Sequence, residues 1–372
     1  MFGFAELRRK LARAMDLCGA WPVGSPWVRQ AVEALPRHEF APERLWQWDG
    51  QAYVPVDRSA EEDRWAGVVY GGPYDAAVTQ VSAGAASSSL SCQAVVADML
   101  DSLDVEPAHR VLELGTGTGW NAALLAYRTG PKLVAGVEVD PLLTDQARMR
   151  LAAAGADVLV ETGDGAKGLP SGAPYDRVIS TYAVDRVPWA WVAQTRPGGR
   201  IVTPWGRLGH VALTVAEDGG SATGWVQGLA QFMPAHGTTA ETGFEDVRGT
   251  VPADDERGVE RDLRPLHDDW HLRFALRVAL PEVRISTAVD EDGVNAWLHD
   301  GVSSWAVLSA LGDGRTVAHQ GGLRRLADLL EKAWDEWLAM GSPELYDFGM
   351  TVEPERQFVW AWDAVTGPRR QS

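Results

Sequence analysis

Residues 111–121 read Val-Leu-Glu-Leu-Gly-Thr-Gly-Thr-Gly-Trp-Asn, and residues 136–140 read Gly-Val-Glu-Val-Asp. The first stretch predicts an apolar strand over 110–114, three glycines at alternate positions, and a helix over 121–128. Because glycine has no Cβ, the backbone can pass close beneath a ligand there. A second strand, over 132–137, ends at Glu138, whose carboxylate can accept hydrogen bonds from both hydroxyls of a ribose. These features predict a nucleoside-binding turn at the carboxyl ends of two strands.

The glycine spacing is Gly-x-Gly-x-Gly, with Glu113 two residues before the first glycine. This pattern resembles the S-adenosylmethionine (AdoMet) site of class I methyltransferases. The resemblance implies that Glu138 holds the ribose and that Asp164 accepts from the adenine amine. Two plainer interpretations stay open, namely that Glu138 is an acid at a helix N-terminus and that Asp164 is a turn residue. The residues expected to bind AdoMet, and its product S-adenosylhomocysteine, are Glu113, Gly115, Thr116, Gly117, Gly119, Glu138, Val139, Gly163, Asp164 and Gly165.

Strand and helix patterns alternate over residues 81–236, which favours right-handed crossovers and a doubly wound parallel sheet. We therefore expect an α/β fold of the class I AdoMet-dependent methyltransferase type, with a Rossmann-like sheet. Residues 1–80 are expected to form an N-terminal helical and loop region, loop-like over 46–65. A linker is expected over 237–265. An extra C-terminal α+β domain is expected over 266–372, with a strand over 270–278 and an amphipathic helix over 323–340.

Composition narrows the possible partners. The chain has 372 residues, 45% of them hydrophobic, and a formal net charge of −17, which argues against nucleic acid as a partner. Two cysteines, Cys18 and Cys92, give neither a disulfide framework nor a metal set, and the eight histidines show no metal-ligand spacing. No apolar stretch is long enough to cross a bilayer, and the Arg-rich start lacks the apolar core of a secretory signal. We expect a cytoplasmic protein without metal or membrane contact.

Further motifs resemble those of the protein L-isoaspartyl O-methyltransferases. Ser89-Leu90-Ser91 is in register with the family's Thr-Ile-Ser-type motif, and residues 34–40 (Ala-Leu-Pro-Arg-His-Glu-Phe) resemble its Val-Pro-Arg-x-x-Phe phrase. Residues 69–73, which include Tyr70, resemble its Tyr-x-Asp-x-Pro segment. The resemblance covers about residues 25–236. It implies that Ser91, with Ser89 as second choice, hydrogen-bonds the acceptor carboxylate, and that Ser87, Ser88 and Tyr70 contact the substrate.

The chain departs from the family pattern in two places. It continues long after the stretch over 231–234 where the family typically ends, and residues 87–89 form a Ser-Ser-Ser run. Both features resemble the branch that tailors ribosomally made peptides in graspetide or lanthipeptide pathways. That resemblance implies methylation of an Asp side chain in a precursor peptide that is already crosslinked. The ester then cyclises to an aspartimide, and the Trp-containing C-terminal domain would recognise the substrate.

Two alternatives stay open. One is a general isoaspartyl repair methyltransferase with an accessory domain, and the other is a non-enzymatic AdoMet-binding regulator. In either enzymatic case the acceptor carboxylate is already ionised at neutral pH, so no strong general base is required. We expect the protein to position the acceptor carboxylate against the methyl group of AdoMet and to exclude water from the site.

Overall fold

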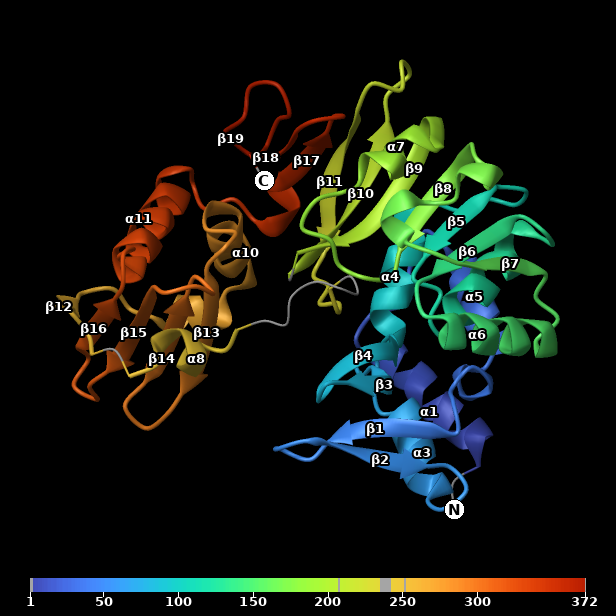
Figure 1. Ribbon diagram of the computed structural model, residues 1–372, viewed down its shortest axis with the longest axis horizontal. Helices are drawn as coiled ribbons and strands as arrows, with labels where there is room; N and C mark the ends of the chain where they lie inside the picture. Colours follow the sequence, from blue (N-terminus) through green and yellow to red (C-terminus); the bar gives the residue numbers. More distant parts are fainter. Residues whose placement is uncertain (1–2, 207, 235–241, 251, 372) are drawn as a thin grey trace. The chain divides into compact units, whose positions relative to one another are not determined.

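The computed structural model describes residues 3–206, 208–234, 242–250 and 252–371, and the chain divides into two compact units (Figure 1). Unit 1 comprises Met1–His236 and the short segment Thr351–Arg356. Unit 2 comprises Gly237–Met350 and Gln357–Ser372. The chain therefore leaves unit 1 once, returns to it for six residues, and leaves it again. The expected C-terminal domain over 266–372 lies within unit 2 except for residues 351–356, and unit 2 begins earlier, at Gly237.

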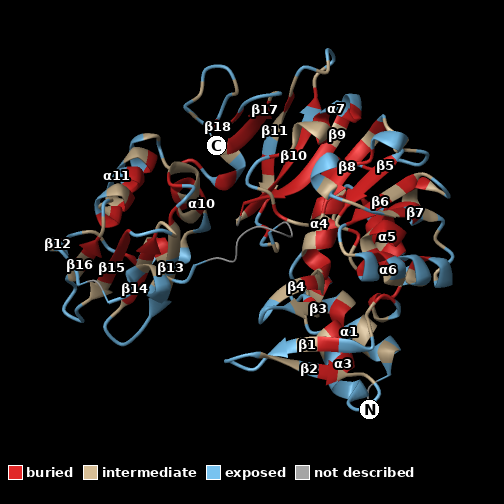
Figure 2. Ribbon diagram, viewed as in Figure 1, coloured by how far each residue is buried: buried red, intermediate tan, exposed pale blue. Residues whose placement is uncertain are grey.

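The central sheet of unit 1 runs in the order β11-β10-β9-β8-β5-β6-β7. The pairs β9–β8, β8–β5, β5–β6 and β6–β7 are parallel, whereas β10 and β11 pair antiparallel. Val111 to Leu114 are all buried, as parallel strands covered on both faces require, and β8 is buried at every residue except Asp176 (Figure 2). The strands are β5 (Val111–Leu114), β6 (Val134–Glu138), β7 (Val158–Thr162), β8 (Tyr175–Ser180), β9 (Thr195–Trp205), β10 (Gly209–Val215) and β11 (Ala222–Gly228).

The helices that follow these strands carry buried apolar faces that share one core with the N-terminal helices. Strand β5 leads into α5 (Trp120–Thr129), β6 into α6 (Pro141–Ala153), and β7 into the 3-10 turns η2 (Gly165–Lys167) and η3 (Pro170–Gly172). Helix α4 (Gln93–Leu103) precedes β5, and α7 (Trp189–Ala193) lies between β8 and β9. This alternation confirms the expected class I methyltransferase fold, and it brings the ends of β5, β6, β7 and β8 to one edge.

The N-terminal part of unit 1 holds more strand than expected. After α1 (Phe4–Leu17), α2 (Pro26–Ala34) and η1 (Arg37–Glu39) comes a four-stranded antiparallel sheet of order β2-β1-β3-β4. Its members are β1 (Arg44–Trp48), β2 (Tyr53–Asp57), β3 (Ala77–Ser82) and β4 (Ala85–Leu90), with α3 (Glu62–Val69) between β2 and β3. The expected loop over 46–65 was therefore wrong. Residues 49–52, which include Gly50, form the tip of a hairpin whose strands bury Leu45 and Val56, and the later polar residues 62–64 begin α3.

Unit 2 is built on a five-stranded antiparallel sheet of order β12-β16-β15-β14-β13. Its strands are β12 (Asp255–Val259), β13 (Arg284–Val289), β14 (Val294–His299), β15 (Trp305–Ala310) and β16 (Thr316–Gly321). Its helices are α8 (Phe244–Arg248), α9 (Arg264–Asp268), α10 (Trp270–Ala279), α11 (Leu326–Ala339) and η4 (Leu345–Asp347). Strand β17 (Phe348–Val352) spans the return to unit 1, and β18 (Gln357–Ala361) pairs with β19 (Arg369–Gln371).

Two expectations for unit 2 were wrong. The expected linker over 237–265 contains α8 and β12, and β12 is an edge strand of the sheet; residues 237–241 and 251 lie outside the described residues. The expected strand over 270–278 is helix α10. Asp269 caps it by accepting the N–H groups of His271 (2.8 Å) and Leu272 (3.1 Å), and the buried positions 272, 275 and 276 follow helical spacing.

In the described part of the chain, no helix is both long and apolar enough to cross a membrane.

Candidate active site

The turn between β5 and α5 needs its glycines. Gly115, Gly117 and Gly119 have φ values of +88°, +54° and +88°, in the left-handed region that favours glycine. A Cβ at Gly115 would also lie 2.7 Å from Thr181 Oγ1, which is shorter than the contacts that a Cβ atom makes with a non-bonded atom. Thr116 is buried and its side chain packs directly on Gly136 of β6. The contact is close enough that a Cβ at Gly136 would lie 2.3 Å from Thr116 Oγ1. The turn is thus fixed from both neighbouring strands.

Glu138 ends β6 with its carboxylate turned back to the glycine turn. Its Oε2 accepts the N–H of Gly117 at 2.8 Å, and its Oε1 accepts the N–H of Asp140 at 3.1 Å. The N-terminus of α6 is capped by a different acid, because Asp140 Oδ1 accepts from Leu142 N at 2.8 Å. Glu138 is therefore not the cap of α6, and its role as the ribose ligand stays a prediction. Val139 follows it with an exposed apolar side chain.

Glu113 lies below the turn and is fully buried. Asn121 Nδ2, at the start of α5, donates to Glu113 Oε1 at 2.8 Å. Burial raises the pKa of Glu113 to about 8, and the nearby charge of Glu138 adds to the rise. A carboxyl group in this position supports the turn from inside the sheet.

Asp164 follows β7 in the sequence Gly163-Asp164-Gly165. Its Oδ1 accepts the N–H of Ala166 at 2.9 Å and so caps η2, and its Oδ2 lies 3.8 Å from Lys167 Nζ. The side chain is half-exposed. The structure therefore gives Asp164 the role of a turn residue, with a carboxylate that is still accessible to a ligand.

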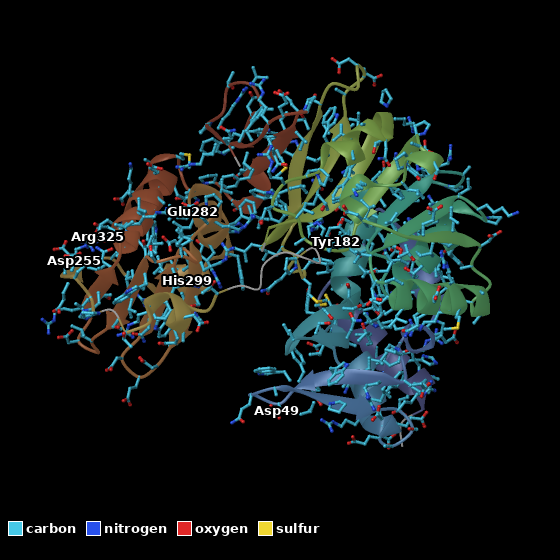
Figure 3. All side chains as sticks on the ribbon, viewed as in Figure 1. Asp49, Tyr182, Asp255, Glu282, His299 and Arg325 are labelled. Atoms are coloured by element: carbon cyan, nitrogen blue, oxygen red, sulfur yellow. The ribbon has the colours of Figure 1, made fainter. Side chains whose placement is uncertain are left out.

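Tyr182 is a residue of this edge that sequence reasoning missed (Figure 3). It follows β8, and its ring reaches from the glycine turn to the Asp164 turn. A Cβ at Gly115 would lie 2.8 Å from its Cδ1, and a Cβ at Gly165 would lie 2.4 Å from its Oη. Burial, together with the charges of Asp164 and Glu138, raises its pKa well above the usual value. Its place directly after a parallel strand was the available signal.

The serine run, residues 87–89, lies within strand β4, and two of its serines are linked to the glycine turn and to the end of β6. Ser88 is buried, accepts from Thr79 Oγ1 at 3.0 Å, and lies beside the turn, since a Cβ at Gly117 would be 3.8 Å from its Oγ. Ser87 donates to Gln80 Oε1 at 2.9 Å, and Gln80 Nε2 donates to Asp140 Oδ2 at 2.9 Å. Gln80 thereby links the serine strand to the end of β6.

Ser91 and Ser89 are both half-buried. Ser91 lies between β4 and α4, and its backbone carbonyl accepts from Arg37 Nη1 at 2.7 Å. The Arg37 guanidinium lies over the ring of Trp120, 4.9 Å from its centroid, and Trp120 opens α5. We call residues 91–92, between β4 and α4, the expected acceptor loop, because Ser91 is expected to orient the acceptor carboxylate. Arg37 therefore connects this loop to α5, the helix that follows the glycine turn. Tyr70 is buried, and its hydroxyl lies 2.7 Å from His38 Nδ1.

A family model described as Protein-L-isoaspartate(D-aspartate) O-methyltransferase (PCMT) matches residues 22–238. A Protein-L-isoaspartate O-methyltransferase of Methanopyrus kandleri is 32% identical over 252 residues, which are 65% of this chain and 96% of the relative. The chain belongs to the PCMT family. A relative of the same description from Ignicoccus hospitalis is 42% identical over 54% of this chain and 82% of its own. A solved structure named protein-L-isoaspartate O-methyltransferase covers 93% of this chain and 96% of its own, with 20% identity and a TM-score of 0.49.

Membership of the family makes the chain an AdoMet-dependent carboxyl O-methyltransferase of the PCMT type. The residues at the sheet edge fit this cofactor. Gly115, Gly117 and Gly119 add no side chains to the turn, and the buried carboxylate of Glu138 is held in place by two backbone N–H groups. Within the described ranges, no group of three His, Cys, Asp or Glu side chains is arranged to hold a metal ion.

Proposed function

We propose that this enzyme methylates an Asp side chain in a modified ribosomal precursor peptide in the cytoplasm, and that the ester then cyclises to an aspartimide. Support for the finer assignment comes from unit 2. The relative from Methanopyrus kandleri is covered almost completely by 252 aligned residues, whereas this chain carries a further compact unit with its own sheet. We assign peptide recognition to unit 2.

In this proposal Glu138 accepts the ribose hydroxyls, and the turn Gly115–Gly119 runs beneath the methionine part of AdoMet. AdoMet supplies an activated methyl group. Ser91 orients the acceptor carboxylate, which attacks as the anion it already is at neutral pH. Ser88, beside Gly117, closes the site toward the serine strand. Catalysis then rests on positioning and on excluding water, because no proton has to be removed from the nucleophile.

The later step needs no residue of the enzyme. A methyl ester is a better electrophile than a carboxylate, so the backbone nitrogen of the next peptide residue attacks its carbonyl carbon. Methanol leaves with the nitrogen's proton, and a five-membered succinimide closes.

The repair reaction is the second candidate, and relatives with that name align over nearly their whole length. One experiment separates the two. The protein is incubated with AdoMet and, in parallel, with a generic isoaspartyl peptide and with a crosslinked precursor and its linear form. Mass spectrometry follows addition of a methyl group and then loss of methanol. Methylation confined to the crosslinked precursor supports peptide tailoring, whereas turnover of the isoaspartyl peptide alone identifies a repair enzyme.

The remaining alternative, a non-enzymatic AdoMet-binding regulator, makes a different prediction for the same assay. S-adenosylhomocysteine would bind, yet no peptide would gain a methyl group.

A further inference from the structure

Unit 1 contains a cavity of about 300 Å³ that is lined by three arginines. It lies between α1, the end of α2 and the start of α4. Arg8, Arg9 and Arg37 line it together with one acid, Glu33, and the polar side chains of Tyr70 and Gln93. A surplus of arginines is notable in a chain whose net charge is −17. The remaining walls are mainly apolar, as in most sites for small ligands.

Arg37 is a buried arginine whose hydrogen-bond acceptors, among the residues that the structure describes, are backbone carbonyl oxygens and not carboxylates. Its side chain is 2% exposed, and its hydrogen-bond acceptors are the carbonyl oxygens of Ser91 at 2.7 Å and Leu90 at 3.5 Å. Its Nε is buried without a hydrogen-bond partner, and no carboxylate of the described residues lies within ion-pair distance of its guanidinium. Burial lowers its pKa to about 10. A buried cation without a counter-charge is costly, and an anion in the cavity would remove that cost.

The cavity adjoins the expected acceptor loop. Arg37 contacts both the cavity and the backbone of Ser91, and Gln93, two residues after Ser91, is part of the cavity wall. An extended peptide advances about 3.3 Å per residue, so a peptide whose acceptor lies at Ser91 can place a neighbouring residue here.

We propose that this cavity binds a second carboxylate of the acceptor peptide, one or two residues away from the carboxylate that is methylated. The inference rests on the proposed function and adds a substrate class to it, namely acidic peptides. Arg8, which also donates to the carbonyl oxygen of Glu33, and Arg9 supply the more exposed guanidinium groups, and Arg37 supplies the buried charge. Paired carboxylate and guanidinium groups form strong, charge-assisted hydrogen bonds.

The test uses the full chain and four peptides. Each peptide carries an acceptor, aspartyl or isoaspartyl, flanked two residues on by either Glu or Gln and labelled with a fluorophore. Binding is measured by fluorescence anisotropy without AdoMet, for the wild type and for the double variant R8Q/R9Q. Lys10→Gln with Arg13→Gln is the matched control, because both residues are exposed on α1 and neither lines the cavity.

We expect the Glu peptides to bind the wild type about tenfold more tightly than the Gln peptides, a difference that is lost in R8Q/R9Q and kept in the control. Equal binding of Glu and Gln peptides to the wild type would overturn the proposal. So would an equal loss of the preference in R8Q/R9Q and in the control, since that outcome indicates general attraction to a basic helix. Methyl transfer to the same peptides is scored separately, so a failed transfer with an intact Glu preference counts against the proposed function and leaves the cavity assignment standing.

Discussion

The backbone N–H of Gly117 donates to Glu138 Oε2 across 2.8 Å, and this bond joins the glycine turn to the acid at the end of the next strand. Two segments to which the proposed function assigns different parts of one cofactor are thereby fixed to each other. The carboxylate keeps its orientation through protein contacts alone, so little ordering remains to be done when a ligand arrives.

Replacing Glu138 with Gln tests whether this carboxylate holds the ribose. The amide keeps the shape but has one acceptor oxygen where the carboxylate has two, so it cannot serve Gly117, Asp140 and a ribose together. We expect the affinity for S-adenosylhomocysteine to fall about 10- to 100-fold, as for lost hydrogen bonds to a charged group. Isothermal titration calorimetry measures it, with Asp145→Asn, an exposed acid on α6, as the control. Unchanged affinity would leave Glu138 a structural acid.

Ser91→Ala separates acceptor positioning from cofactor binding. The variant keeps the carbonyl that Arg37 holds and removes only the hydroxyl. We expect kcat to fall about 10- to 100-fold through misplacement of the acceptor, with the affinity for S-adenosylhomocysteine unchanged. Ser59→Ala, at an exposed turn position before α3, is the control. Full turnover by Ser91→Ala together with a defect in Ser88→Ala would transfer the role to the serine beside the glycine turn.

A pair of substitutions tests whether Tyr182 shapes the cofactor site. A Cβ at Gly165 would meet the Tyr182 hydroxyl at 2.4 Å but its ring carbon Cζ at 3.2 Å, so the hydroxyl is the main obstacle. We expect Gly165→Ala to displace the ring and weaken S-adenosylhomocysteine binding several-fold, and Tyr182→Phe to restore most of the loss in the double variant. Gly67→Ala on α3, where a Cβ meets open space, is the control. Additive effects would mean that the two residues are not coupled at this site.

Glu113 should make stability depend on pH. Its pKa is about 8 in the folded protein and near 4.3 in an unfolded chain, so the folded protein retains a proton that the unfolded chain has released. The stability that this proton provides is present below the unfolded pKa and is lost as pH rises through about 8. We expect the urea midpoint to fall between pH 7 and pH 9, and Glu113→Gln to reduce the fall.

Glu217→Gln is the control, because Glu217 is exposed, and it should keep the wild-type fall of the urea midpoint between pH 7 and pH 9. The range starts at pH 7 because two other groups with shifted pKa values, Asp98 and His210, titrate lower. Burial raises the pKa of Asp98 to about 6 and lowers that of His210 to about 4. If Glu113→Gln left the fall of the urea midpoint between pH 7 and pH 9 unchanged, the pH dependence of stability would belong to another group.

The parallel sheet and its glycine turn could be predicted from sequence because local signals and tertiary structure agree there. Continuous apolar strands, glycines at positive φ and an acid at a strand end are all short-range patterns. Helix α10 could not be predicted in this way, because seven apolar residues in ten resemble a strand until the cap at Asp269 is recognised. The link from Arg37 to Ser91 spans 54 residues and depends on how α2 packs, which no local pattern records.

The brief return of the chain to unit 1 affects how unit 2 can be studied. Thr223 Oγ1 of β11 donates to Thr351 Oγ1 at 3.2 Å, so a residue encoded far downstream completes the methyltransferase unit. A stop codon placed after residue 236 would remove this partner together with unit 2. Loss of activity in such a truncated protein would then not measure peptide recognition. Unit 2 is better excised as the internal segment 237–350 and the terminal segment 357–372, with residues 351–356 spliced back to the end of unit 1 through a short linker.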